Sequence, residues 1–217
     1  MNKMNIFVGL LYLKNIYRFG LAGFIGLFYT CPYMHASSES SDKTATAIFA
    51  GGCFWCTEAA FDHVPGVIKT TSGYTGGHLD KPTYGDVSSG SSGHYEALKV
   101  TYDPSKVSYN QLLDIFWESI DPTDAGGQFA DRGSQYKTAI FYLNEDQYQA
   151  ALQSKKQVEQ KLGMKVQTAI LKASTFYPAE EAHQDYHQKN PMQYQYYKRG
   201  SGRPQRLQEL WGRMREK

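Results

Sequence analysis

The stretch TAIFAGGCFWCTEAAF at residues 46–61 decides the fold, because an apolar run leads through two glycines directly into a segment with two cysteines. Residues 46–50 have the length and apolar character of a buried β-strand. The segment that follows Gly51 and Gly52 has the apolar spacing of a helix. We therefore predict that Cys53 lies at a strand-to-helix turn, in the first turn of a helix.

The rest of the chain mixes strand and helix patterns. Ser108 and Gln111 form a capping-box pattern before an apolar helix face, and Gly163 is typical of a residue that ends a helix. Such patterns predict strands at 67–74, 96–102, 138–143 and 166–173, and helices at 109–119, 145–162, from Pro178 to before Asn190, and 204–216. Because no strict βαβ rhythm is present, we predict an α+β fold, a two-layer sandwich with a mixed sheet and a ferredoxin-like core surrounded by long loops.

The amino-terminal segment, residues 1–36, differs in composition from the rest. It holds three basic residues, no acidic one and an uncharged apolar run at 19–33, shorter than the ~20 residues of a membrane-spanning helix. Ala36 offers a small residue before a polar stretch, as at a processing site. We predict a signal peptide at 1–36, or a membrane anchor if it is not cleaved, then a polar linker at 37–45 and the functional domain at 46–217. The protein is expected to be periplasmic or secreted.

Charge narrows the choice of partners. The formal net charge of the chain is +2, and the leader contributes three of the positive charges, so the domain itself is slightly acidic. Outside the leader there is no basic stripe with interleaved aromatic residues, so nucleic acid is not expected as a partner. Nothing in the composition indicates an obligate oligomer, and we expect a monomer.

Cys53 and Cys56 are the only cysteines outside the leader, since the third, Cys31, lies within it. One pair is too few for a disulfide scaffold, and a bridge between residues three apart would stabilise the fold little, which favours a redox role. Unpaired backbone N–H groups and the helix dipole lower the pKa of a thiol at a helix N-terminus, as expected for Cys53. Cys56, one turn further on, is close enough to attack an oxidised Cys53. Phe54 and Trp55 offer an apolar wall.

The cysteine pair alone leaves other interpretations open. Cys53, Cys56 and His63 look like part of a zinc site, although no second cysteine pair is present to complete it. A C-x-x-C pair also fits a general dithiol–disulfide oxidoreductase. A non-enzymatic alternative is an exported binding module whose cysteines are structural. The sequence has no flavin or nucleotide motif, so no cofactor and no metal are expected.

A series of short motifs follows in order over residues 46–200: GGCFWC at 51–56, PGV at 65–67, SGYTGG at 72–77, PTY at 82–84, GHYEA at 93–97, VTYDP at 100–104, DRGSQY at 131–136 and AHQDYHQKNP at 182–191. Together they resemble the A-type methionine sulfoxide reductases, the peptide-methionine (S)-S-oxide reductases. The resemblance implies an enzyme that reduces methionine S-sulfoxide, free and in oxidised proteins, to methionine. It covers essentially the whole domain after the linker.

The resemblance also implies roles for individual residues. The thiolate of Cys53 attacks the sulfoxide sulfur while Glu96, in the GHYEA motif, delivers a proton to the oxygen. That carboxyl must be protonated near neutral pH, which requires a pKa raised by a desolvated pocket. Tyr84 and Tyr136 match the two tyrosines that hydrogen-bond the sulfoxide oxygen, and among 17 tyrosines only their motif positions single them out. The substrate site is completed by Phe54 and Trp55, which hold the methyl group, and by Asp131 and His183, which shape it.

Recycling is the point where this chain departs from many members of the family. They carry glycine or serine at position 56 and recycling cysteines near the carboxyl terminus, whereas this chain has no cysteine after Cys56. The resemblance therefore implies that the sulfenic acid on Cys53 condenses with Cys56. The resulting bridge would be reopened by thioredoxin, or by a periplasmic thioredoxin-like reductant, through thiol–disulfide exchange.

Overall fold

The computed structural model describes residues 44–212. The leader predicted at 1–36, with Cys31, and most of the linker predicted at 37–45 lie outside these residues. Within 44–212, no helix is both long and apolar enough to cross a membrane.

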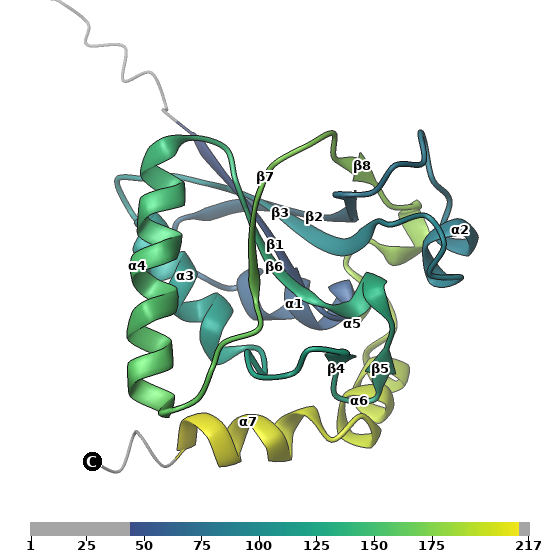
Figure 1. Cartoon of the computed structure of the whole chain (residues 1–217). Helices are drawn as coiled ribbons and strands as arrows, with labels where there is room; N and C mark the ends of the chain where they lie inside the picture. Colours follow the sequence, from purple (N-terminus) through teal and green to yellow (C-terminus); the bar gives the residue numbers. More distant parts are fainter. Residues whose placement is uncertain (1–43, 213–217) are drawn as a thin grey trace, which may run out of the picture. The chain divides into compact units, whose positions relative to one another are not determined.

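A six-stranded mixed sheet runs through the domain (Figure 1). Its strands lie in the order β7-β6-β1-β3-β2-β8, and neighbouring strands are antiparallel except for β6 and β7, which are parallel. This confirms the predicted mixed sheet. The strands are β1 (Ala45–Gly51), β2 (Val67–Thr75), β3 (Tyr95–Tyr102), β6 (Thr138–Tyr142), β7 (Ala169–Lys172) and β8 (Tyr177–Pro178), and a separate pair is formed by β4 (Gly127–Gln128) and β5 (Asp131–Arg132).

The predicted ferredoxin-like core is present. The elements β1, α1 (Phe54–Phe61), β2, β3, α3 (Tyr109–Glu118) and β6 occur in this order, with α2 (Tyr84–Ser88) inserted before β3, and with β4, β5 and η1 (Ser134–Tyr136) inserted before β6. Their strands lie in the order β6-β1-β3-β2. Helix α4 (Glu145–Leu162) lies beside α3 (Figure 1). Local sequence sets these helix ends: Ser108 and Gln111 make the predicted capping box, and Gly163 ends α4 in the left-handed conformation at φ 65°.

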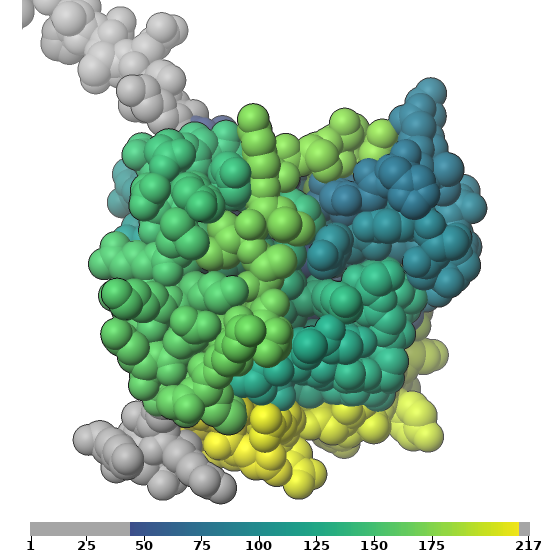
Figure 2. All heavy atoms as spheres, viewed as in Figure 1, coloured from purple at the N-terminus to yellow at the C-terminus, as the bar shows by residue number. Residues whose placement is uncertain are grey.

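Six further helices are described within residues 44–212. They are α2 (Tyr84–Ser88), η1 (Ser134–Tyr136), η2 (Glu181–His183), α5 (Tyr186–Lys189), α6 (Pro191–Gly200) and α7 (Arg203–Trp211). In Figure 2 the last of these, α7, packs against the underside of the domain.

The main hydrophobic core joins β1 to the two helices of the ferredoxin-like unit. Phe49 of β1 is fully buried and stacks on Phe61 of α1 and Phe116 of α3, with ring centroids 5.3 and 5.0 Å apart. Because side chains alternate along a strand, Ile48 and Ala50 join a second cluster on the opposite face. The stacking of Phe49 fixes α1 against β1, and so fixes the turn between them that carries the first cysteine.

The helix predicted from Pro178 is wrong. Tyr177 and Pro178 instead pair with Tyr74 and Gly73 as the edge strand β8. An edge position tolerates proline, because its missing N–H would not have bonded a neighbouring strand. Helical structure begins only at Glu181.

Further boundaries differ from the predictions, and the helices α2, η1 and α6 are additional. The strand predicted at 166–173 is limited to the four residues of β7, and α7 begins at Arg203 and is described to residue 212. Helix α6 has no counterpart in the sequence patterns, since its segment PMQYQYYKRG has almost no aliphatic residues. The helix buries Tyr194 against the rest of the domain. Tertiary packing therefore stabilises this helix, although its sequence has no clear apolar periodicity.

Candidate active site

The two cysteines lie where the sequence places them, at the turn from β1 into α1. Cys53 is the N-cap residue of α1, and its carbonyl accepts hydrogen bonds from the backbone N–H groups of Cys56 and Thr57 at 3.1 and 3.2 Å. Gly52 has φ 83°, and a Cβ atom there would lie 2.6 Å from the Cβ of Gln128. Only glycine therefore allows the chain to turn at this point.

Both thiols are buried, with 6% of Cys53 and 5% of Cys56 exposed. Burial raises the pKa of the Cys53 thiol, and the hydrogen bond to Cys56 and the nearby Glu96 carboxyl raise it further. The hydrogen bond from Cys53 lowers the pKa of the Cys56 thiol, and Arg203 adds to this effect. The predicted low pKa of Cys53 is therefore wrong for the resting site. Desolvation outweighs the helix dipole, and the negative charge of the pair lies on Cys56.

Glu96 meets the condition stated above for a general acid, a carboxyl whose pKa is raised by burial. It lies on β3, is 2% exposed, and its Oε2 accepts a hydrogen bond from the backbone N–H of Phe54 at 3.0 Å. Burial raises the pKa of the Glu96 carboxyl to about 8, although this hydrogen bond acts in the opposite direction. At neutral pH the carboxyl is protonated and lies at the amino-terminal end of α1, beside Cys53.

Two phenol groups lie close to the same carboxyl. Tyr84 begins α2 and Tyr136 ends η1, and the two hydroxyls lie close enough for Tyr136 to influence the pKa of Tyr84. Burial raises the pKa of both tyrosines, and the Glu96 carboxyl contributes to each shift. Both phenols therefore stay protonated and can donate hydrogen bonds to an oxygen. The capping box of Thr83 and Asp86 fixes the start of α2 and with it Tyr84.

The remaining predicted site residues form an aromatic wall. Trp55 stacks on Tyr186 with a centroid separation of 3.8 Å, and its Nε1 donates to Nδ1 of His183 at 3.3 Å. His183 in turn packs on the rings of Phe54 and Tyr84, at 5.3 and 4.4 Å. Burial lowers the pKa of His183, so this imidazole is neutral and acts as a packing and hydrogen-bonding group. The structure thus brings Phe54, Trp55 and His183 together.

Asp131 lies on β5 and is held by a residue that the motifs do not include. The hydroxyl of Tyr197, on α6, donates a short hydrogen bond to Asp131 and also hydrogen-bonds the Cys53 thiol. Tyr194, one turn earlier on α6, lies close enough to Cys56 to lower the pKa of its thiol, and within residues 44–212 its hydroxyl has no other hydrogen-bond partner. The two tyrosines lie three residues apart, after the proline that begins α6, so they share one face of a helix. This spacing is the feature of the sequence from which they could have been predicted.

The sequence analysis did not single out Glu180, a carboxylate just after the edge strand β8 that binds the start of α2. Glu180 accepts hydrogen bonds from the backbone N–H of Tyr84 at 2.7 Å and from the hydroxyl of Tyr74 at 2.8 Å. It therefore helps to place Tyr84 next to His183.

Among residues 44–212, no group of three His, Cys, Asp or Glu side chains is placed to hold a metal ion.

Comparison with known proteins places this arrangement in context. The sequence model of a family described as peptide methionine sulfoxide reductase matches residues 45–215. The peptide methionine sulfoxide reductase MsrA of Bacillus licheniformis is 52% identical over 175 residues, covering 80% of this chain and 97% of that protein. The Bacillus subtilis protein of the same name is 51% identical over 174 residues, covering 79% and 98%.

Solved structures agree with the sequence relatives. Methionine sulfoxide reductase A of Corynebacterium diphtheriae superimposes with a TM-score of 0.66 at 35% identity, covering 68% of this chain and 76% of that one. Reduced Mxr1 from Saccharomyces cerevisiae also superimposes with a TM-score of 0.66, at 31% identity, covering 69% and 87%.

Proposed function

The chain belongs to the peptide methionine sulfoxide reductase family, and on this premise we propose that it reduces methionine S-sulfoxide, free and in proteins, to methionine. One observation carries the proposal. A buried cysteine, a buried carboxyl that is protonated at neutral pH and two phenol donors converge beside an aromatic wall. That is the set of groups needed to attack a sulfoxide sulfur, to protonate its oxygen and to hold its methyl group.

In the first step the Cys53 sulfur attacks the sulfoxide sulfur. The oxygen is transferred to Cys53, which becomes a sulfenic acid, while the substrate leaves as methionine. Glu96 delivers a proton to the oxygen, and the proton lost by the Cys53 thiol balances it. Tyr84 and Tyr136 donate hydrogen bonds to the oxygen as negative charge develops there. Packing of the methyl group against Phe54 and Trp55 orients the substrate, in a site shaped by Asp131 and His183.

In the second step the enzyme is recycled through the cysteine pair. Cys56 attacks the Cys53 sulfenic acid and forms a disulfide, with release of water. The partner that reopens this bridge is a dithiol protein of the thioredoxin kind, because reduction of a disulfide by exchange needs two thiols from the donor.

The experiment that tests the function uses a synthetic peptide with each methionine sulfoxide epimer in turn. The full chain is incubated with the peptide and dithiothreitol, and the peptide mass is followed by mass spectrometry. Loss of one oxygen from the S epimer alone is the expected result. If a folded protein with free thiols reduced neither epimer, the reductase assignment would fail and the general dithiol oxidoreductase would take its place.

Replacing Cys56 by serine is expected to stop turnover after the first reaction. Without a reductant, Cys56→Ser still forms one methionine per enzyme, but Cys53 remains a sulfenic acid that a dione reagent can trap. With thioredoxin as the donor, steady-state turnover is expected to fall at least about tenfold, because the donor attacks a disulfide and none forms. The Cys31→Ser variant is the matched control and keeps full turnover. Wild-type turnover of Cys56→Ser with thioredoxin would contradict the recycling route.

We also propose that the protein is exported by its first 36 residues, on the basis of their basic, apolar and small-residue pattern. An exported enzyme cannot meet cytosolic thioredoxin, so a membrane-relayed thioredoxin-like reductant is required. Cell fractionation combined with mass spectrometry of the amino terminus tests this. A periplasmic or secreted chain that starts near Ser37 supports cleavage, a membrane-bound chain that starts at Met1 supports an anchor, and a cytosolic chain overturns export.

A further inference from the structure

Arg203 is a buried cation that the proposed reaction has not used. The residue is 3% exposed, and its guanidinium donates to the carbonyl of Ser119 at 2.7 Å and to the carbonyl of Gly51 at 3.2 Å. Its Cζ lies 4.3 Å from the centroid of the Phe129 ring. Gly51 is the last residue of β1, two positions before Cys53, so the guanidinium lies directly against the turn that carries the cysteine pair.

A buried guanidinium is normally paired with a carboxylate, but this one is not. Within residues 44–212, no carboxylate oxygen lies within 4.0 Å of an Arg203 nitrogen. Two carbonyls accept hydrogen bonds from the guanidinium and the Phe129 ring packs on its face, but none of them supplies a negative charge. Because an uncompensated buried charge is costly, the site needs an anion close to this cation.

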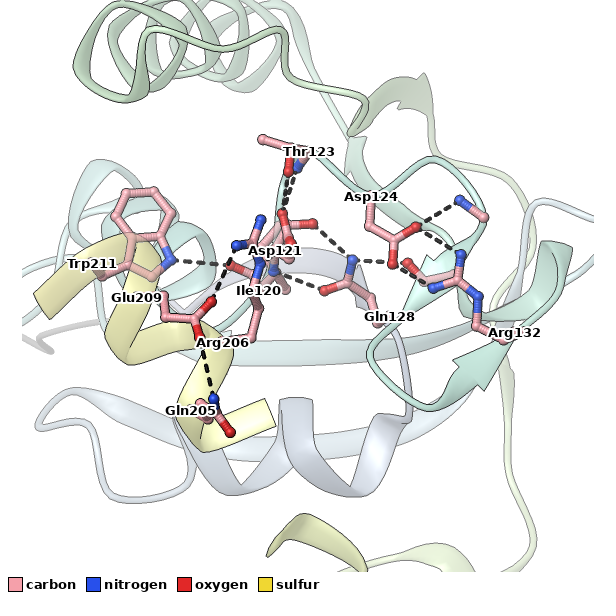
Figure 3. A network of polar contacts seen from close by, with 12 residues as sticks. Ile120, Asp121, Thr123, Asp124, Gln128, Arg132, Gln205, Arg206, Glu209 and Trp211 are labelled. Atoms are coloured by element: carbon pink, nitrogen blue, oxygen red, sulfur yellow. Dashed lines mark hydrogen bonds and ion pairs between the residues drawn. The ribbon is translucent and has the colours of Figure 1, made fainter. Parts of the chain in front are cut away.

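Helix α7 is held in place by several contacts besides those of Arg203. Figure 3 shows that Arg206 donates to Asp121 at 2.7 Å and that the Trp211 indole donates to the carbonyl of Ile120 at 3.1 Å. The Gln128 side chain both donates to and accepts from the backbone of Asp121. These contacts fix α7 one to two turns after Arg203 and leave its charge free for another purpose.

Three titratable groups sense the charge of Arg203. They are the Asp131 carboxyl, which already accepts the hydrogen bond of Tyr197, the Tyr194 hydroxyl and the Cys56 thiol. Cys56 is faced by charged or titratable groups from four elements: Cys53 on its own helix α1, Glu96 on β3, Tyr194 and Lys198 on α6, and Arg203 on α7. Glu96 is neutral at neutral pH, and the others are hydrogen-bond donors or cations. The surroundings of the Cys56 sulfur are therefore arranged for a thiolate.

We propose that Arg203 is the internal counter-ion of the Cys56 thiolate and a positioning residue for the step that closes the Cys53–Cys56 disulfide. In that step the Cys56 sulfur attacks the sulfur of the Cys53 sulfenic acid. The S–S bond forms while the S–O bond breaks, and hydroxide leaves and takes a proton from solvent to become water. The electron pair that Cys56 contributes makes the new bond, so the step needs no further oxidant or reductant. The role of Arg203 in disulfide formation rests on the proposed function, whereas its position beside the cysteine turn does not.

The charge pairing is tested by titrating Cys56 alone. In the full chain with Cys31→Ser and Cys53→Ser, the thiolate absorbance of Cys56 is followed against pH, and the serine hydroxyl still offers a hydrogen bond. With Arg203 present, the midpoint is expected below that of an ordinary cysteine thiol, because the guanidinium favours the thiolate. Arg203→Met is expected to raise the midpoint by about one unit or more, and Arg203→Lys to restore most of the shift. Arg206→Met, three residues further along the same helix, is the matched control and leaves the midpoint unchanged.

A second measurement separates the counter-ion role from a structural one. In a single turnover with the sulfoxide peptide, Arg203→Met is expected to move the pH midpoint of disulfide formation up together with the pKa of the Cys56 thiol, and Arg203→Lys to restore it. Loss of a merely structural residue would lower the rate of disulfide formation without moving its pH midpoint.

Equal midpoints for Arg203→Met and Arg206→Met would overturn the proposal. If Arg203→Met does not fold, the Cys31→Ser, Cys53→Ser protein that retains Arg203 still tests the proposal. A Cys56 midpoint above pH 8 in that protein overturns the proposal equally. The titration needs no sulfoxide, so it gives its answer even if the reductase function fails.

Discussion

Replacing Cys53 by serine is expected to abolish sulfoxide reduction, with a loss of roughly 10⁴-fold or more in turnover. The loss is expected because the Cys53 sulfur both attacks the sulfoxide and receives its oxygen, and a serine hydroxyl can do neither near neutral pH. Among residues 44–212, the one other thiol is that of Cys56, which lies one helical turn further along α1. The measurement is methionine formed in a single turnover from the S epimer of the peptide.

The matched control for this variant is Cys56→Ser, which carries the same chemical change one turn along α1. It is expected to release one methionine per enzyme, whereas Cys53→Ser releases none. Since both side chains are buried and similar in size, thermal unfolding of the two variants should shift by comparable amounts. Equal methionine yields from the two variants would show that the nucleophile has been assigned to the wrong cysteine.

Replacing Glu96 by glutamine is expected to lower the rate of methionine formation by about 10²- to 10⁴-fold, the usual contribution of a general acid. The amide keeps the volume of the side chain, and its oxygen can still accept the hydrogen bond from Phe54. What is lost is the proton that the carboxyl delivers to the sulfoxide oxygen. The rate of the first turnover, measured by rapid quench, is the quantity to compare.

The pH dependence of this step follows from the raised pKa. Because burial raises the pKa of the Glu96 carboxyl to about 8, its acid form predominates at neutral pH, and the first turnover should slow as the pH rises through 8. The glutamine variant should lack this decrease. The same shift acts on stability: the folded state holds a proton that the unfolded chain releases above about pH 4, so Glu96 costs stability increasingly from there up to pH 8. Glu96→Gln should remove that dependence.

Glu96→Gln also separates the reductase from a general dithiol oxidoreductase. Disulfide exchange needs only the two thiols, so an artificial disulfide substrate should react with the glutamine variant as fast as with the wild type. Retention of full sulfoxide reduction by Glu96→Gln would remove the carboxyl from the mechanism and favour the dithiol oxidoreductase.

The sequence by itself determined the elements whose cause is local. The apolar run at 46–50, the two glycines after it and the helical spacing beyond them define the turn that carries Cys53, and this turn is present in the structure. The capping box at Ser108 and the left-handed Gly163 likewise set helix ends from a few neighbouring residues. The motifs also singled out the side chains that the structure brings together around Cys53, because motif order carries information that composition does not.

Only the tertiary structure decided features that depend on residues far apart in the chain. Which of the two thiols carries the charge is set by desolvation and by Arg203, some 150 residues away, and the helix-terminus argument therefore failed for Cys53. Tyr197 reaches Asp131 from a helix that local pattern does not predict, and Pro178 pairs as an edge strand although its sequence suits a helix start. Periodicity and capping act within a few residues, whereas burial and charge pairing act between segments that only folding brings into contact.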